Sequence, residues 1–154
     1  MIIVSDTSAV TSLLQIGRLE ILPQLYREVV IPTEVAVELR RFHAMLPEFV
    51  RVVEVTDRAR FDQLHAELDS GEAAAITLML EGRGDLLLID ELRGRRIAAR
   101  EGLPVVGVLG VLLEARQRRI IPSLAEAISQ LETIADFRLS PQLKHRALQA
   151  AGER

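Results

Sequence analysis

Cysteine is absent from the chain of 154 residues, and aromatic side chains are scarce, at 3%. Without cysteine the protein can form no disulfide bond, hold no metal ion through thiolates and use no cysteine nucleophile. Carboxylate, histidine and hydroxyl groups therefore remain to carry any chemistry. Apolar residues make up 49% of the chain, which at this length is enough for one buried core.

Long hydrophobic runs are absent as well. The longest, Leu103 to Leu113, has about half of the roughly 20 residues that span a bilayer, and it contains one proline and two glycines. Met1 is followed by Ile2-Ile3-Val4-Ser5-Asp6, which has neither the basic segment nor the small-residue cleavage site of a secretory signal. We expect a cytoplasmic protein that does not enter a membrane.

A charge excess of one sign is also missing, because the formal net charge is only −3. Net charge alone therefore gives no reason to expect a polyanionic partner. The charges are unevenly distributed, however, since residues 92–119 contain seven arginines and two glutamates. The guanidinium fork suits phosphate or carboxylate groups, although a solvated helix face or a GC-rich genome also produces such segments. This basic stretch is a candidate anion-binding surface.

Short apolar segments alternate with amphipathic segments, and capping or turn residues separate them. The predicted strands are residues 2–4, 29–31, 52–55, 85–90 and 105–106. The predicted helices are residues 10–16, 18–26, 32–42, 58–68, 72–80, 91–101, 108–118, 123–134 and 141–150. Uniformly apolar strands that alternate with helices form parallel sheets covered on both faces. We expect one three-layer α/β/α domain over residues 1–154 with a mainly parallel central sheet, a core of about residues 1–120, and C-terminal helices over about 121–154.

Two acidic residues follow predicted strands directly. Asp6 comes after residues 2–4, and Asp90 ends the apolar run 85–90. In open α/β sheets ligands bind beyond the carboxyl ends of the strands, so both side chains are candidates for a functional site. Each is also a common helix N-cap, which accepts hydrogen bonds from free backbone N–H groups. Taken singly, either residue fits the N-cap interpretation at least as well.

Two glutamates lie near the starts of predicted helices. Glu38 shares a helix face with Glu34, a like-charge pair that is unfavourable unless a cation such as Arg41 lies nearby. Glu72 belongs to the capping cluster Asp69-Ser70-Gly71-Glu72, which precedes a run of alanines. Small side chains let that helix lie close to its neighbours and bring Glu72 near the strand ends. Favourable charge in the first helical turn explains Glu72 equally well.

All four acids are predicted to lie beside strand ends, where several carboxylates repel one another unless a cation neutralises them. Oxygen donors without a soft ligand favour Mg²⁺ or Mn²⁺ over zinc. The histidines share no ligand spacing; they are His43, His65 and His145. No G-x-S-x-G turn is present, which argues against a serine hydrolase. We therefore predict a divalent-cation site.

Four segments occur in order over about residues 1–120, namely Val4-Ser5-Asp6-Thr7-Ser8, Ile31–Leu39, Gly71–Ile76 and Leu86–Glu91. With these segments the chain resembles the PIN domain family, the metal-dependent nucleases that include the VapC-type toxins of toxin–antitoxin pairs. Three further features resemble an uncharacterised bacterial and archaeal PIN-like subfamily; they are Asp90-Glu91, Arg93-Gly94-Arg95-Arg96 and Gly107–Leu112.

The resemblance implies a metal-dependent endoribonuclease that hydrolyses single-stranded RNA, the toxin of a type II toxin–antitoxin system. It implies that the catalytic and metal-binding acids are Asp6, Glu38, Glu72 and Asp90. It implies that Thr7, Ser8 and Glu91 support them, and that Arg93, Arg95 and Arg96 bind RNA phosphates. The implied cofactor is Mg²⁺ or Mn²⁺, and the implied partners are a second copy of the chain and a small antitoxin protein. With one tyrosine and four phenylalanines, we expect little base stacking, so selectivity comes from RNA shape or a partner.

Two positions depart from the family pattern. Many PIN nucleases have aspartate where this chain has Glu72, and the segment after Asp90 lacks the common Asp-Phe ending and has Glu91 instead. The alternative is therefore a PIN-like module that binds or assembles with little or no catalysis, using its C-terminal helices for an oligomer or partner.

Two other α/β classes fit poorly. A phosphoacceptor receiver requires a later lysine in the core, whereas the one lysine is Lys144, and a dehalogenase-type phosphatase requires a second aspartate where Ser8 stands.

Overall fold

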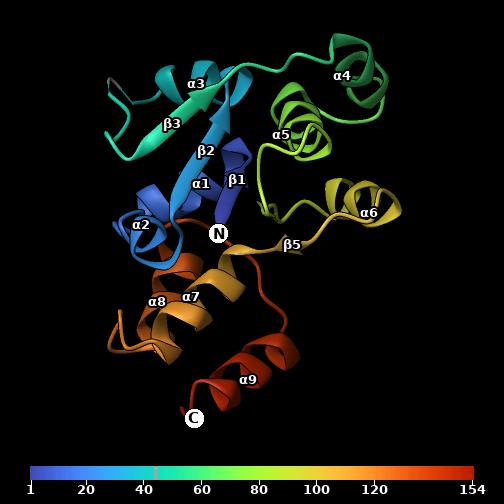
Figure 1. Ribbon diagram of the computed structural model, residues 1–154. Coiled ribbons are helices and arrows are strands. Elements are labelled where there is room, and N and C mark those ends of the chain that lie inside the picture. The colour runs from blue at the N-terminus through green and yellow to red at the C-terminus, as the bar shows by residue number, and fades with distance from the viewer. Residues whose placement is uncertain (44) are drawn as a thin grey trace.

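A computed structural model describes residues 1–43 and 45–154, and its centre is a five-stranded sheet (Figure 1). The strands are β1 (Ile2–Ser5), β2 (Glu28–Pro32), β3 (Val50–Val53), β4 (Leu86–Leu88) and β5 (Val105–Val106). All pairings are parallel, and the strand order is β3-β2-β1-β4-β5. The carboxyl ends of the strands therefore meet at one edge of the sheet. The predicted parallel sheet is confirmed.

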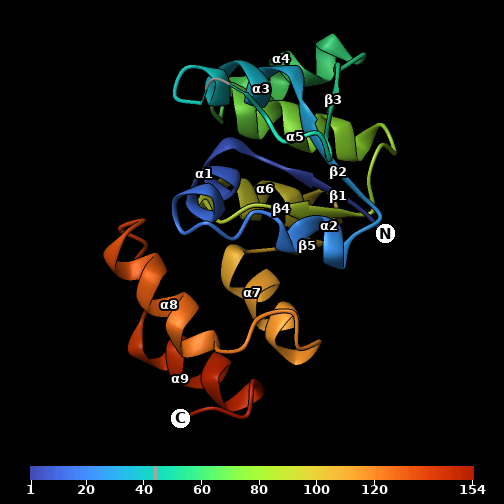
Figure 2. The same cartoon turned by 90° about the vertical axis from the view of Figure 1, so that its left-hand side faces the viewer.

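Helices cover both faces of this sheet. Those in the described residues are α1 (Thr7–Gln15), α2 (Ile21–Leu25), α3 (Thr33–Arg40), α4 (Arg58–His65), α5 (Ser70–Leu80), α6 (Leu92–Arg100), α7 (Val108–Gln117), α8 (Leu124–Thr133) and α9 (Pro141–Ala150). One apolar cluster contains buried residues of α1, α2, α7 and α8, and a second contains those of α4, α5 and α6. Figure 2 shows α4 and α5 on one side of the sheet and α7, α8 and α9 on the other. The predicted three-layer α/β/α architecture is confirmed.

Alternation along the buried strands divides their side chains between the two clusters. Ile3 and Val4 of β1, and Leu87 and Leu88 of β4, expose none of their surface. Successive side chains of a strand point to opposite faces. Ile3 and Leu88 accordingly belong to one cluster, and Val4 and Leu87 belong to the other. Apolar side chains on both sides of β1 and β4 are therefore buried, because both faces of the sheet are covered.

The predicted elements are present with shifted ends. The strand predicted over 52–55 lies at 50–53. Pro32 was expected to open a helix, but it ends β2 opposite Val53 and then serves as the N-cap of α3. Its fixed φ, here −72°, fits both an extended strand end and an N-cap position. Helices α1 and α5 begin earlier than predicted because Asp6 and Asp69 cap them.

The last two helices pack against α7, and the chain end is tied back to them. Glu153 accepts hydrogen bonds from the backbone N–H groups of Leu124 and Ala125, at 2.8 and 3.1 Å, and from Arg116 Nε at 2.9 Å. Because Leu124 and Ala125 open α8, Glu153 satisfies N–H groups that the helix itself leaves free. No helix in the described part of the chain is long and apolar enough to cross a membrane.

Candidate active site

Asp6 lies at the centre of the candidate site. It follows β1, caps α1 and exposes 1% of its surface. Its Oδ1 accepts a hydrogen bond from the backbone N–H of Ala9 at 3.1 Å. Its Oδ2 is buried and has no hydrogen-bond partner among the described residues. A buried carboxylate oxygen without a partner is costly in a folded protein, which points to a group that this site is built to receive.

Other acids converge on Asp6 from the end of β4 and from the start of α5. The pKa of Asp6 is raised to about 8, mainly by burial and also by the negative charges of Glu72, Asp90 and Asp69, although the hydrogen bond from Ala9 lowers it. Carboxylates influence one another in this way when they lie close together in a poorly solvated environment. The structure thus brings together three of the four predicted acids, and Asp69 joins them.

Glu72 lies in the first turn of α5 and is 7% exposed. Asp69 caps this helix, and its Oδ1 accepts a hydrogen bond from the Glu72 N–H at 2.8 Å. The pKa of Glu72 is raised to about 7, mainly by burial and also by the neighbouring Asp69 carboxyl group. The negative charge of Asp69 disfavours the ionised form of Glu72, since the two like charges repel each other.

Asp90 comes two residues after β4 and reaches the start of α7. Its carboxylate accepts a hydrogen bond from the backbone N–H of Val108, at 3.1 Å to Oδ2. A Cβ atom at Gly107 would stand 2.5 Å from Asp90 Oδ1, so only glycine allows this approach. Burial raises the pKa of Asp90, while Val108 and Arg95 lower it.

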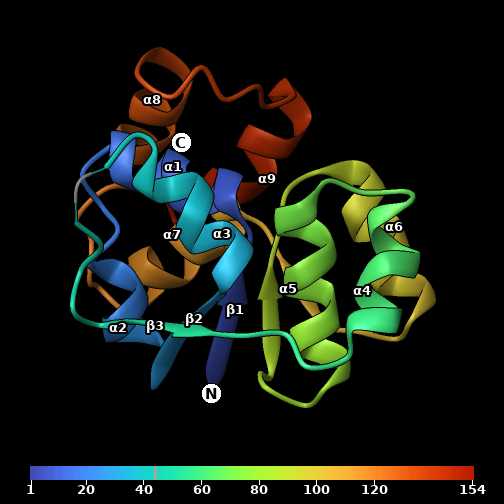
Figure 3. The same cartoon turned by 90° about the horizontal axis from the view of Figure 1, so that it is seen from above.

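Glu38 lies on α3, which is adjacent to both α1 and α5 (Figure 3). The Ser70 hydroxyl donates to Glu38 Oε1 at 3.3 Å. A Cβ atom on Gly71 would stand 3.0 Å from the same oxygen and 2.9 Å from Thr7 Oγ1. Glu38 and Thr7 therefore face each other across Gly71. Thr7 Oγ1 is also buried without a hydrogen-bond partner among the described residues.

The remaining predicted residues are mostly exposed to solvent. Ser8 and Glu91 are exposed, and the charge of Glu91 contributes to the raised pKa of Glu72. Arg93 and Arg96 are exposed on α6, whereas Arg95 is partly buried and donates to the Ile89 carbonyl at 3.0 Å. The three arginines therefore differ in their surroundings. Of these three, Arg95 is the one whose charge acts on the pKa of Asp90.

The donor set has the chemistry of a site for a hard divalent cation. It offers carboxylate and hydroxyl oxygens, and Asp6 Oδ2 and Thr7 Oγ1 have no other partner in the described chain. Within residues 1–43 and 45–154, however, no three acidic or histidine side chains as they stand are grouped to hold one metal ion. The residues fit such an ion by their chemistry and by the convergence of their charges.

Asp69 is the site residue that sequence reasoning missed. Its position before a helix marked it as an N-cap, and the structure confirms that cap. A side chain that caps the N–H group three residues later lies beside that residue's own side chain at the first turn. The pair Asp69 and Glu72, separated by Ser70 and Gly71, therefore carried a usable signal for two adjacent carboxyl groups.

A family model described as DUF3368, a PIN domain, matches residues 2–153, nearly the whole chain. No curated protein matches the sequence significantly. PIN domains are in general nucleases, which hydrolyse phosphodiester bonds. The match spans every strand of the sheet and all four acids that were predicted from the sequence. The chain therefore belongs to the PIN domain family.

Proposed function

We propose that the protein is a metal-dependent endoribonuclease that hydrolyses phosphodiester bonds in single-stranded RNA. The observation that carries the proposal is Asp6, whose buried Oδ2 has no partner among the described residues and whose carboxyl group lies amid three other acids. Such a cluster stays charged at neutral pH only when a cation compensates it. Capping of α1 alone does not explain why Asp6 is buried, because the N-cap hydrogen bond satisfies only one of its two carboxylate oxygens.

Asp6, Glu72 and Asp90 would hold Mg²⁺ or Mn²⁺, with Glu38 as the fourth acid. When bound, the cation lowers the pKa of a water molecule and compensates charge on the reacting phosphate. Thr7, the first residue of α1, faces Glu38 across Gly71, where its hydroxyl would orient a carboxylate or water. Ser8 and Glu91, at the exposed rim, would assist in the same way.

Arginines of α6 would bind the RNA backbone. Arg93 and Arg96 are solvent-exposed on α6, which begins two residues after Asp90, and a guanidinium forms strong, charge-assisted hydrogen bonds with phosphate oxygens. Arg95 donates a hydrogen bond to the Ile89 carbonyl, and its charge lowers the pKa of Asp90. It would therefore stabilise the ionised Asp90 carboxylate and not bind RNA directly. These contacts make binding dependent on salt concentration and independent of RNA sequence.

In the cell, we propose that the enzyme is the toxin of a type II toxin–antitoxin system, a VapC-like homodimer inhibited by a small antitoxin protein. The resemblance of its acidic motifs to VapC-type toxins supports this role. Light scattering during size-exclusion chromatography tests the dimer, and a monomer at micromolar concentration would contradict it. A short reading frame immediately upstream, whose product binds the protein and blocks cleavage, is the expected antitoxin.

The decisive experiment measures cleavage of single-stranded RNA with Mg²⁺ or Mn²⁺ by the wild type and by Asp6→Asn and Asp90→Asn. We expect both variants to lose activity, while Asp62→Asn, an identical change on the exposed face of α4, retains it. Equal activity in the variants and the wild type would reject the site. If the wild type neither cleaves RNA nor binds Mn²⁺ by calorimetry, the chain is a binding or assembly module instead.

A further inference from the structure

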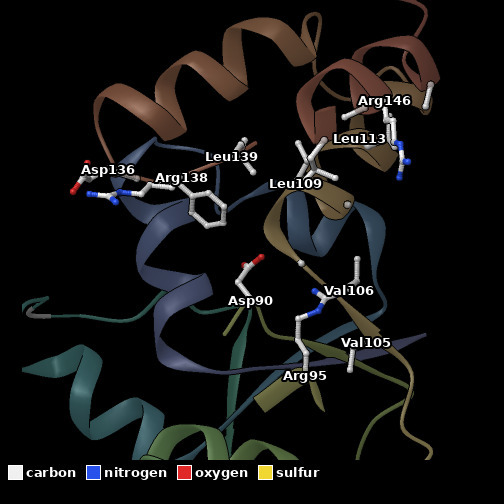
Figure 4. A pocket seen from close by; sticks show the side chains of 17 residues that line it. Asp90, Arg95, Val105, Val106, Leu109, Leu113, Asp136, Arg138, Leu139 and Arg146 are labelled. Atoms are coloured by element: carbon white, nitrogen blue, oxygen red, sulfur yellow. The ribbon is translucent and has the colours of Figure 1, made fainter. Parts of the chain in front are cut away.

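A cavity of about 910 Å³ opens beside Asp90, between β5, α7, α9 and the segment before α9. Figure 4 shows the Asp90 carboxylate pointing into it, with Leu109 and Leu139 on the opposite side. Asp90 therefore belongs both to the acidic cluster and to the wall of this cavity. A molecule in the cavity would lie next to the candidate reaction centre.

The cavity combines apolar walls with arginines. Its apolar walls come from β5, α7 and α9, and include Val106, Leu109 and Leu143. Its cationic groups come from three separate segments; they are Arg95, Arg138 and Arg146. Arg138 and Arg146 are exposed and form no ion pair with an acid in the described chain. A ligand with a flat apolar body and anionic groups matches this lining, because it covers the walls and pairs the guanidinium groups.

Phe137 is the one aromatic residue among the described residues that line the cavity. It is partly buried and also packs against the apolar cluster of α7 and α8, which fixes its position. An aromatic ring held in this way offers a face on which a nucleobase stacks whatever its sequence. An apolar side chain of a protein would leave the arginines unpaired, so the lining favours a nucleotide.

We propose that this cavity is a nucleotide-binding subsite, which receives a nucleotide of the RNA strand next to the scissile phosphate. The base packs on Phe137 and the leucines, and Arg138 and Arg146 bind its flanking phosphates. The inference rests on the proposed function, since it places the RNA of that reaction. It also departs from the expectation of little base stacking, because one of the few aromatic rings lies beside Asp90.

The test of stacking measures the anisotropy of a fluorescein-labelled single-stranded RNA that binds the full chain in EDTA, where cleavage is prevented. Phe137→Leu keeps an apolar side chain but removes the ring, and we expect it to weaken binding roughly tenfold. Phe137→Tyr keeps the ring and should bind as the wild type does. Thermal melts of both variants show whether the fold is intact.

The test of the arginines compares two charge reversals. The variant Arg138→Glu with Arg146→Glu should bind RNA more weakly, with a salt dependence reduced by about 1.4 in the slope of log K against log salt, as for two lost phosphate contacts. The matched control is Arg27→Glu with Arg83→Glu, two exposed arginines near the opposite, amino-terminal edge of the sheet. The control should retain wild-type affinity and slope.

The proposal is overturned if Phe137→Leu binds RNA as tightly as the wild type, or if both charge reversals weaken binding equally. It is also overturned if the cavity variants change the oligomeric state in light scattering without changing RNA affinity, since the cavity then receives a second copy of the chain. Failure of the proposed nuclease function can be distinguished from failure of the proposed subsite. An absence of cleavage with Mg²⁺ or Mn²⁺, together with RNA binding that depends on Phe137, removes the nuclease and retains the subsite.

Discussion

Asp69 accepts a hydrogen bond from the Glu72 N–H at 2.8 Å, and the charge of its carboxyl group raises the pKa of Glu72. The residue that caps α5 therefore also affects the pKa of Glu72, a candidate metal ligand. Asp69 is exposed, whereas Glu72 is 7% exposed, so the charge of the outer residue acts on the inner one. The helix cap therefore also controls how readily Glu72 gives up its proton.

Replacing Asp69 with asparagine should lower the pKa of Glu72 from its value of about 7. The asparagine side chain would still accept the N–H bond, because asparagine is as good an N-cap as aspartate. It would carry no negative charge, so the repulsion that raises the pKa of Glu72 is lost. NMR titration of the Glu72 side-chain carbon in metal-free protein measures the effect. An unchanged midpoint would show that Asp69 does not contribute to the raised pKa of Glu72.

The stability of the metal-free protein should fall as pH rises from about 4 to about 8. The pKa of Asp6 is about 8 in the folded protein against an ordinary 3.8, so the folded state retains a proton that the unfolded state releases. Stability from this group is complete below its unfolded pKa and is lost through this window, by an amount on the order of a few kcal/mol. Urea unfolding in EDTA at several pH values measures the loss.

Asp6→Asn is the matched control for this pH dependence. It preserves an acceptor for the Ala9 N–H but cannot ionise, so its stability should vary less with pH and exceed that of the wild type at pH 9. Adding Mn²⁺ at pH 9 should stabilise the wild type and leave the variant unchanged, because binding to the folded state alone raises its stability. Parallel pH profiles would contradict the assignment of the effect to Asp6.

Local pattern was enough to predict the sheet and part of the site. Runs such as residues 86–88 are apolar throughout because both faces of a parallel sheet are covered, and Asp6 and Asp90 follow such runs directly. The carboxyl ends of adjacent parallel strands necessarily share one edge. β1 and β4 are neighbours in the sheet, which brings these two acids together. Their positions directly after apolar runs were enough to propose that they meet at one edge of the sheet.

Features that depend on contacts between distant segments were not predictable in this way. The cavity beside Asp90 has walls from β5, α7 and residues 135–150, whose mutual placement is set by packing rather than by local pattern. Pro32 also shows the limit, because its φ suits a helix start and a strand end alike, and pairing with β3 decides between them.

Gly71→Ala should destabilise the protein by about 1–3 kcal/mol, the usual cost of forcing an extra carbon into a packed interior. The new Cβ would stand 2.9 Å from Thr7 Oγ1 and 3.0 Å from Glu38 Oε1, so the Thr7 hydroxyl, the Glu38 carboxylate or α5 itself must shift. RNA cleavage should fall as well, because such a shift displaces Thr7 or Glu38 within the candidate site. Urea unfolding and a cleavage assay on the same preparation measure both effects.

The double variant Thr7→Ala with Gly71→Ala identifies the contact responsible. Removing the Thr7 hydroxyl removes the shorter of the two close approaches, so the double variant should recover part of the stability that Gly71→Ala loses. Stability effects of residues in contact are not additive, and the difference from additivity measures their interaction. Additive losses would show that the cost of Gly71→Ala arises elsewhere.

Glu153→Gln should destabilise the protein by about 1 kcal/mol at neutral pH, since it weakens charge-assisted hydrogen bonds at the start of α8. These bonds, together with Arg116, hold the pKa of Glu153 below its ordinary value of 4.5. The folded state therefore favours the charged form, so the contribution is present above about pH 4.5 and is lost as pH falls through the lowered pKa. Urea unfolding at pH 7 and at pH 3 measures the difference between variant and wild type.

The control for Glu153 is Glu132→Gln, which removes a partly exposed ion pair with Lys144 on the same group of helices. An exposed pair contributes little to stability, so this variant should differ from the wild type by less than about 0.5 kcal/mol at either pH. Glu153 differs because its oxygens accept from backbone N–H groups that α8 cannot satisfy by itself. Equal effects of the two substitutions would mean that Glu153 acts only as another surface charge, and that the end of the chain does not stabilise α8.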